Sequence, residues 1–180
     1  PALLPQIVSA GTDAGPLRPE MIRKLHLPKD CRLSVGCLDQ YAGAIGAGNA
    51  LPPRASETTG TVLALVQCAD RFNPDLPSHG VFQGPAPQDG VYYRMVFSSL
   101  SANLLEAYQR SHASQMSFDQ MNFLAQQAEA AGSTCRLDPV ASEAQGRPVF
   151  LTPPDTVGDA TLAIMLAVAQ RLQEHIEQVC

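Results

Sequence analysis

The chain has no tryptophan, and only 16% of its 180 residues are charged. Its basic residues form no stripe with aromatic residues, and its formal net charge is −5, so we expect no nucleic-acid partner. No apolar run approaches the roughly 20 residues that a membrane span needs. No secretory leader pattern opens the sequence either, so we expect no membrane partner and a cytoplasmic location.

Cysteine pairs at metal-ligand or redox spacing are also missing. The five cysteines are an odd, scattered set without C-x-x-C spacing, which predicts free thiols in a reducing compartment. We interpret Cys37 and Cys68 as small hydrophobic residues within strands. The four histidines lie apart from one another in the sequence, so no histidine metal site is expected.

The residues that are present predict a globular α/β protein. At 180 residues and 45% hydrophobic composition, the chain can bury a substantial core as one domain or part of one. Apolar patterning predicts the following elements: a buried strand over 32–37 ending at Asp39, a helix over 40–48, a strand pair over 56–66, a strand over 91–97, helices over 102–110 and 117–131, a looser segment over 132–154, and a helix from Thr156 or Asp159 to about 179.

These elements also predict which apolar residues pack in the core. In the helix over 117–131 we expect Ser117 or Asp119 near the start and core contacts for three residues: Phe118, Met121 and Leu124. The last helix should turn seven apolar residues to the core: Leu162, Ile164, Met165, Leu166, Val168, Leu172 and Ile176.

Two features of residues 36–61 suggest phosphoryl-transfer chemistry. Asp39 is expected at a strand end, where a carboxylate is rigidly held. Gly60 permits a tight turn whose N–H groups can face phosphate oxygens, and the Thr61 hydroxyl adds a donor. The residues alone leave a second interpretation of Asp39 open, in which it only caps the following helix.

The order and spacing of these features resemble the FGGY carbohydrate kinases. Residues 36–40 read Gly-Cys-Leu-Asp-Gln, a small-residue helix follows over 42–48, and residues 59–61 read Thr-Gly-Thr, 22 positions (61 − 39) from the aspartate to the last threonine. Upstream, residues 15–20 and 25–28 resemble the family's G-x-L-x-P-E helix and L-x-L-P exit. The resemblance covers roughly residues 15–108 and is to the start of the family's second domain.

The resemblance implies an RNase H-like, actin-like ATPase fold, incomplete in this chain, and the use of ATP with Mg²⁺. It implies that Asp39 is the general base for a sugar or polyol hydroxyl, and that Gln40 touches the sugar with it. It implies that Thr59, Gly60 and Thr61 hold the ATP phosphates.

The sequence departs from the family's pattern at several points. Family members place glycines where residues 101–103 read Ser-Ala-Asn, and we expect Ser101 to be a helix N-cap. The family's first-domain phosphate loop and later adenosine motif are not found. We therefore expect residues 1–28 to be a lead-in from a first domain and 29–180 to be a partial second domain, inactive alone and prone to form homo-oligomers.

Two alternatives to a kinase stay open. One is a catalytically lapsed relative that binds a sugar or nucleotide as a sensor, and the other is an actin-like phosphotransferase with a different acceptor. An intact Asp39 favours the kinase, because a sensor needs no base.

Overall fold

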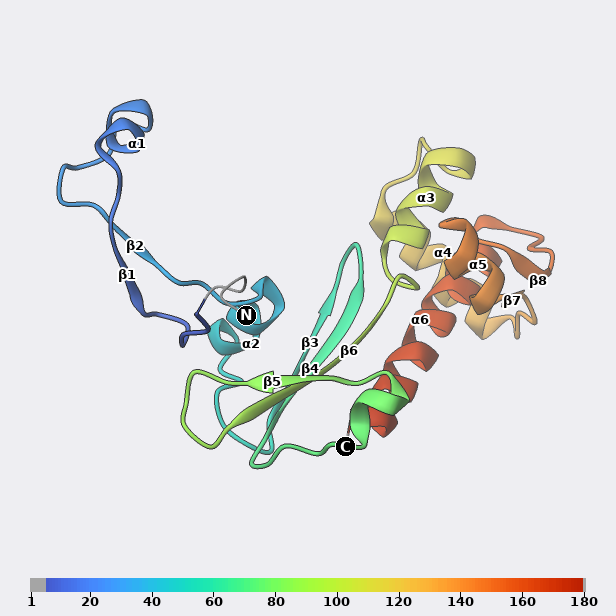
Figure 1. Ribbon diagram of the computed structural model, residues 1–180. Helices are drawn as coiled ribbons and strands as arrows, with labels where there is room; N and C mark the ends of the chain where they lie inside the picture. Colours follow the sequence, from blue (N-terminus) through green and yellow to red (C-terminus); the bar gives the residue numbers. More distant parts are fainter. Residues whose placement is uncertain (1–5, 180) are drawn as a thin grey trace.

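The computed structural model describes residues 6–179, which form an extended arm, a central sheet and a group of helices (Figure 1). The arm is a two-stranded antiparallel ribbon of β1 (Asp13–Pro16) and β2 (Arg32–Ser34), with α1 (Pro19–Lys24) between them. No residue of α1 is buried, and Arg32 pairs with Asp13 at 2.7 Å between Nε and Oδ2. The arm projects away from the rest of the chain (Figure 1).

The prediction of a buried strand ending at Asp39 is wrong in both respects. β2 ends at Ser34 and all three of its residues are exposed, including Leu33 at 55%. The ribbon has no second layer packed on it, so its apolar residues have nothing in the described chain to be buried against. Cys37 follows the strand in an exposed connection and is therefore not the buried strand residue that we expected.

The central sheet has four antiparallel strands in the order β3-β4-β6-β5. β3 (Ala55–Thr59) and β4 (Leu63–Ala69) form a hairpin whose turn holds residues 60–62, which confirms the predicted strand pair. The predicted strand over 91–97 is β6 (Tyr92–Ser98), and β5 (Phe82–Pro85) pairs with it after a short 3-10 turn, η1 (Leu76–His79).

Side chains of β4 alternate between two covered faces, as a strand buried on both sides requires. On one face, Ala44 of α2 (Asp39–Gly46) packs against a cluster from β4 and β6: Val66, Cys68, Tyr93 and Met95. On the other face, Val179 of the last helix packs against Leu65, Val81 and Val96. The sheet is therefore the middle layer between α2 and α6.

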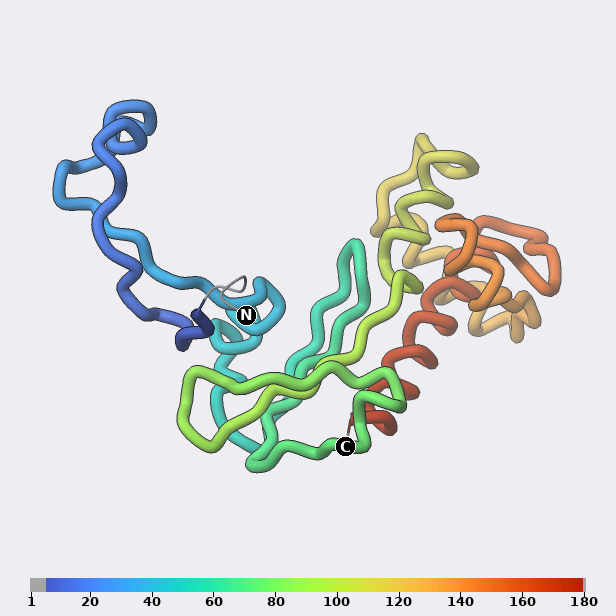
Figure 2. Tube along the Cα trace, viewed as in Figure 1, coloured from blue at the N-terminus to red at the C-terminus, as the bar shows by residue number. Residues whose placement is uncertain are grey.

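The helical group follows β6. It contains α3 (Asn103–His112), α4 (Phe118–Ala130), α5 (Pro139–Gln145) and α6 (Val157–Val179), with the small ribbon of β7 (Arg136–Leu137) and β8 (Phe150–Thr152). Ser117 caps α4 in a reciprocal capping box with Gln120, as its position predicted. The tube in Figure 2 shows how α6 runs from this group back to the sheet.

Three of the seven residues predicted for the core face of α6 are substantially exposed, as is one of α4. They are Met165 at 44%, Leu166 at 56%, Ile176 at 44% and Phe118 at 40%. Met121 and Ile164 are buried as predicted. An amphipathic pattern indicates that a helix face is apolar, but it does not say whether a neighbour in this chain covers that face.

The segment predicted as looser, 132–154, contains α5 between the β7 and β8 strands. Asp138 caps α5 through a 2.9 Å bond from the Ala141 N–H, and Gly146 ends it in the left-handed conformation. None of the helices among residues 6–179 is both long and apolar enough to cross a lipid bilayer.

Candidate functional site

Asp39 is the first residue of α2 and is exposed. Leu38 is the N-cap, so the alternative in which Asp39 is the capping residue does not match the helix boundary. The Asp39 Oδ1 atom nevertheless accepts a 2.8 Å hydrogen bond from the Gln40 N–H. A negatively charged side chain at a helix start also interacts favourably with the helix dipole.

The other end of α2 is fixed to the sheet by a buried asparagine that sequence reasoning missed. Asn49 is 2% exposed, and its Nδ2 atom donates to Ser56 Oγ at 3.0 Å and to the Val66 carbonyl at 2.9 Å. Its own carbonyl accepts from Cys68 Sγ at 3.3 Å. Asn49 thus ties the segment after the helix to the sheet, while Asp39, the first residue of the helix, is exposed.

A hollow of about 270 Å³ lies beside the connection that leads to Asp39. It is lined by Val8, Ser9, Ala10, Gly36, Cys37, Leu38, Tyr41, Pro85, Ala86, Pro87 and Tyr93. The rings of Tyr41 and Tyr93 stack with centroids 4.7 Å apart. Burial, with smaller contributions from Cys68, raises the pKa of Tyr93 to about 12, and burial also raises the pKa of Tyr41. Both phenols therefore stay protonated at neutral pH.

The second predicted feature, the β3–β4 turn, closes on itself. The Gly60 N–H donates to the Val62 carbonyl at 3.2 Å, and the Thr59 hydroxyl donates to the Glu57 carboxylate. Thr61 is exposed, and a Cβ built on Gly60 would meet nothing within 4 Å. The turn therefore leaves open space beside Gly60, and no hydrogen bond within residues 6–179 engages the Thr61 hydroxyl.

The start of α3 holds this turn from behind. The Gly60 carbonyl accepts from Ser101 Oγ at 2.9 Å and from the Asn103 N–H at 3.3 Å. Ser101 is fully buried, and the N-cap of α3 is Ala102, so our interpretation of Ser101 as an N-cap is wrong. Its hydroxyl bonds to a residue 41 positions earlier instead of to its own helix, a contact that no local sequence signal reveals.

The structure does not bring Asp39 into contact with the β3–β4 turn. Tyr41, two residues after Asp39, stacks on Tyr93, which pairs with Cys68. Cys68 lies five residues along β4 from Leu63, at the turn, which corresponds to about 17 Å of strand. Within residues 6–179, no hydrogen bond or ion pair joins Asp39 to residues 59–61.

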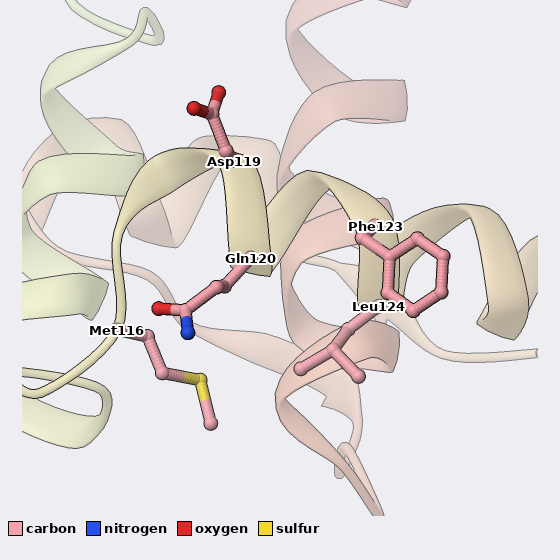
Figure 3. Close-up of a pocket in the computed structure, with 5 residues that line it drawn as sticks. All are labelled: Met116, Asp119, Gln120, Phe123 and Leu124. Atoms are coloured by element: carbon pink, nitrogen blue, oxygen red, sulfur yellow. The ribbon is translucent and has the colours of Figure 1, made fainter.

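Another hollow, of about 410 Å³, lies on α4 and holds none of the predicted site residues. Five residues line it: Met116, Asp119, Gln120, Phe123 and Leu124, of which Asp119 is the only charged one (Figure 3). Its lining offers an apolar surface without a converging set of charged groups. The described part of the chain also contains no group of three or more His, Cys, Asp or Glu residues placed to hold a metal ion.

Comparisons with known proteins give a match in structure but not in sequence. No family model matches the chain, and no curated protein matches it. Among solved structures, the ligand-bound xylulose kinase from Lactobacillus acidophilus superposes with a TM-score of 0.79 at 17% identity. Gluconate kinase from the same organism gives 0.78 at 17%, and xylulose kinase from Rhodospirillum rubrum gives 0.74 at 18%.

These matches cover 97 to 98% of this chain but only 37% of each kinase. At such low identity the likeness establishes the fold and not the activity. The chain therefore has an α/β, actin-like fold that corresponds to part of a sugar kinase domain.

Proposed function

We propose that this chain is part of an ATP-dependent carbohydrate kinase and provides its general base and one phosphate-binding loop. The observation that carries the proposal is Asp39, an exposed carboxylate at the start of a helix anchored to the sheet, with no ion-pair partner among residues 6–179. The likeness in fold to solved sugar kinases supports the same conclusion.

In this mechanism Asp39 takes the proton from a sugar or polyol hydroxyl as that oxygen attacks phosphorus. Gln40, the next residue, would hydrogen-bond the same substrate. Its backbone N–H already bonds to Asp39 Oδ1, which leaves Oδ2 free to face the hydroxyl. Proton acceptance by a correctly placed base contributes roughly 10²- to 10⁴-fold to a rate.

The β3–β4 turn would bind the phosphates. The space beside Gly60 admits a phosphate oxygen, and Thr61 supplies a hydroxyl and an N–H group next to it. Thr59 precedes them and shapes the turn through its bond to Glu57. ATP with Mg²⁺ supplies the phosphoryl group and offsets its charge when bound. The residues of this chain orient the hydroxyl and the phosphoryl group, and none of them forms a covalent bond with the phosphoryl group.

Because the chain spans 37% of the kinases that it resembles, activity is a proposal about the protein that contains this sequence. We propose that the chain alone is inactive, since Asp39 and the turn lie apart in it. Its exposed apolar side chains on α6 and α4 favour contact with further polypeptide or with another copy. A cytoplasmic location fits this function and is part of the proposal.

A nucleotide or sugar sensor is the second candidate function. The Glu57 carboxylate favours it, because a negative charge bonded to Thr59 at the mouth of the turn opposes tight phosphate binding. A sensor of this kind would bind the nucleotide weakly and reversibly without transferring its phosphoryl group.

The test is ATP-dependent ADP release by the full protein across ketoses, aldoses and polyols, with Asp39→Asn measured beside it. Turnover with one substrate class, reduced at least about 100-fold by Asp39→Asn, supports the kinase and the base. The matched control is Asp70→Asn, an exposed aspartate that directly follows β4 at the end far from the turn.

The other outcomes separate the alternatives. Turnover that survives Asp39→Asn would remove Asp39 from the mechanism and leave it a helix-start residue. Saturable sugar or nucleotide binding without turnover on any substrate would favour the sensor.

A further inference from the structure

A carboxylate in α5 organises the segment that holds the β3–β4 turn. Glu143 Oε1 accepts from Ser98 Oγ at 2.7 Å, from the Ser99 N–H at 3.1 Å and from Ser99 Oγ at 3.4 Å. Its other oxygen, Oε2, lies 3.6 Å from Arg171 of α6. One acidic side chain thus joins α5, the end of β6 and α6.

The charge of Glu143 is matched to this environment. Burial alone would raise the pKa of this carboxyl, but the bond from Ser98, the charge of Arg171 and the bonds from Ser99 together lower its pKa. Glu143 is therefore an anion at neutral pH and accepts strong, charge-assisted hydrogen bonds.

The contact continues from Glu143 to the turn through buried atoms. Ser98 Oγ accepts from the Leu100 N–H at 3.0 Å while it donates to Glu143, so it fixes the chain as it leaves β6. Leu100 and Ser101 are both fully buried. Ser101 Oγ then donates to the Gly60 carbonyl.

We propose, on the basis of the function above, that Glu143 is a positioning residue for the phosphate-binding turn. It touches neither nucleotide nor sugar. It fixes residues 98–101, and Ser101 fixes the peptide plane that follows Gly60. The direction of the Thr61 N–H belongs to that plane, so Glu143 controls the donor that faces the phosphates. Arg171 separates this role from a general effect on stability, because it pairs with the same carboxylate while no hydrogen bond or ion pair among residues 6–179 joins it to residues 98–101.

The experiment compares three variants of the full protein by the KM for ATP, the KM for sugar and thermal unfolding. Glu143→Ala removes every bond to Ser98 and Ser99 and should raise the KM for ATP about five- to tenfold, with the KM for sugar within about twofold of the parent. Glu143→Gln keeps an acceptor oxygen for both serines and should restore most of the ATP affinity. Arg171→Met should lower the unfolding temperature without raising the KM for ATP.

An unchanged KM for ATP in Glu143→Ala, or an equal rise in Arg171→Met, would overturn the proposal. Amide hydrogen exchange on the 180-residue chain separates this result from failure of the proposed function. Glu143→Ala should accelerate exchange at Gly60, whose N–H is bonded within the turn, whether or not the protein turns over ATP. Unaltered Gly60 exchange in that variant would overturn the positioning role even in an active kinase.

Discussion

The two halves of the candidate site differ in how firmly this chain holds them. The β3–β4 turn is fixed by a buried serine, a backbone N–H and a carboxylate that joins three elements. Asp39 instead lies exposed at the start of a helix, and the contacts that hold this helix to the sheet come from later residues, Tyr41, Ala44 and Asn49. The turn, where we propose that phosphates bind, is therefore held by contacts within this chain, whereas few contacts of the described residues surround the Asp39 carboxylate.

The largest effect should come from disrupting the packing of α6 against α4. In Gly158→Ala, the added Cβ of α6 would lie 2.5 Å from the Leu124 carbonyl oxygen of α4, a backbone atom that cannot rotate away. We expect the two helices to separate and the free energy of unfolding to fall by about 3 kcal/mol, the upper part of the range for overpacking. Urea unfolding measures this. Gly46→Ala, whose Cβ meets nothing, is the control, and an equal loss in both would contradict the packing argument.

The second effect should appear in binding and not in stability. Gly60→Ala places a methyl group in the open space beside the turn, where we propose that a phosphate binds. The ATP affinity of the full protein should fall about tenfold, or 1.4 kcal/mol, with an unchanged unfolding midpoint. Calorimetric titration with ATP measures it. Unchanged affinity would show that the phosphates lie elsewhere and would weaken the assignment of the turn.

A smaller effect concerns how the free energy of unfolding depends on pH. His175 is 4% exposed in α6, and burial, then the charge of Arg171, lowers its pKa below the ordinary value of 6.5. As the pH falls below that value, the unfolded chain takes up a proton that the folded chain does not, so stability falls. We expect a loss of about 1 kcal/mol between pH 7 and pH 5 that His175→Leu abolishes.

Unfolding measured across that pH range, on the parent and on His175→Leu, tests this expectation. Glu143 acts in the same direction only at lower pH, because its folded pKa is lowered and its contribution is lost as the pH falls through that value. An identical slope in both proteins between pH 7 and pH 5 would assign the dependence to other groups.

The smallest effect should be on stability at Asp39 itself. Asp39→Asn keeps an oxygen that can accept from the Gln40 N–H and loses only the charge at an exposed helix start. We expect a change below about 0.5 kcal/mol in the free energy of unfolding. A large destabilisation would show that Asp39 has a structural role. Asp39 would then be held by this chain in the way that the β3–β4 turn is.

Local signals predicted much of this arrangement. The Gly60-Thr61 interruption marked a hairpin, Ser117 or Asp119 was expected near a helix start that the structure places at Ser117, and the apolar strand over 91–97 was found nearly in full. These features depend on neighbours within a few positions, so the sequence shows them directly. The burial of residues 32–37 was predicted wrongly, because a short apolar strand has the same sequence pattern whether or not a second layer covers it.

The sequence by itself determined the order of the longer strands and helices and the 22-residue separation of Asp39 from Thr61 in the Gly-Thr turn, but not β5, β7, α5 or β8. Only the tertiary structure decided that Ser101 holds the Gly60 carbonyl, that Asn49 fixes α2 and that Glu143 joins α5 to the end of β6. These contacts span 41, 17 and 45 positions. Each satisfies a polar group that folding removes from water, and its partner is chosen by which segments the packed layers bring together.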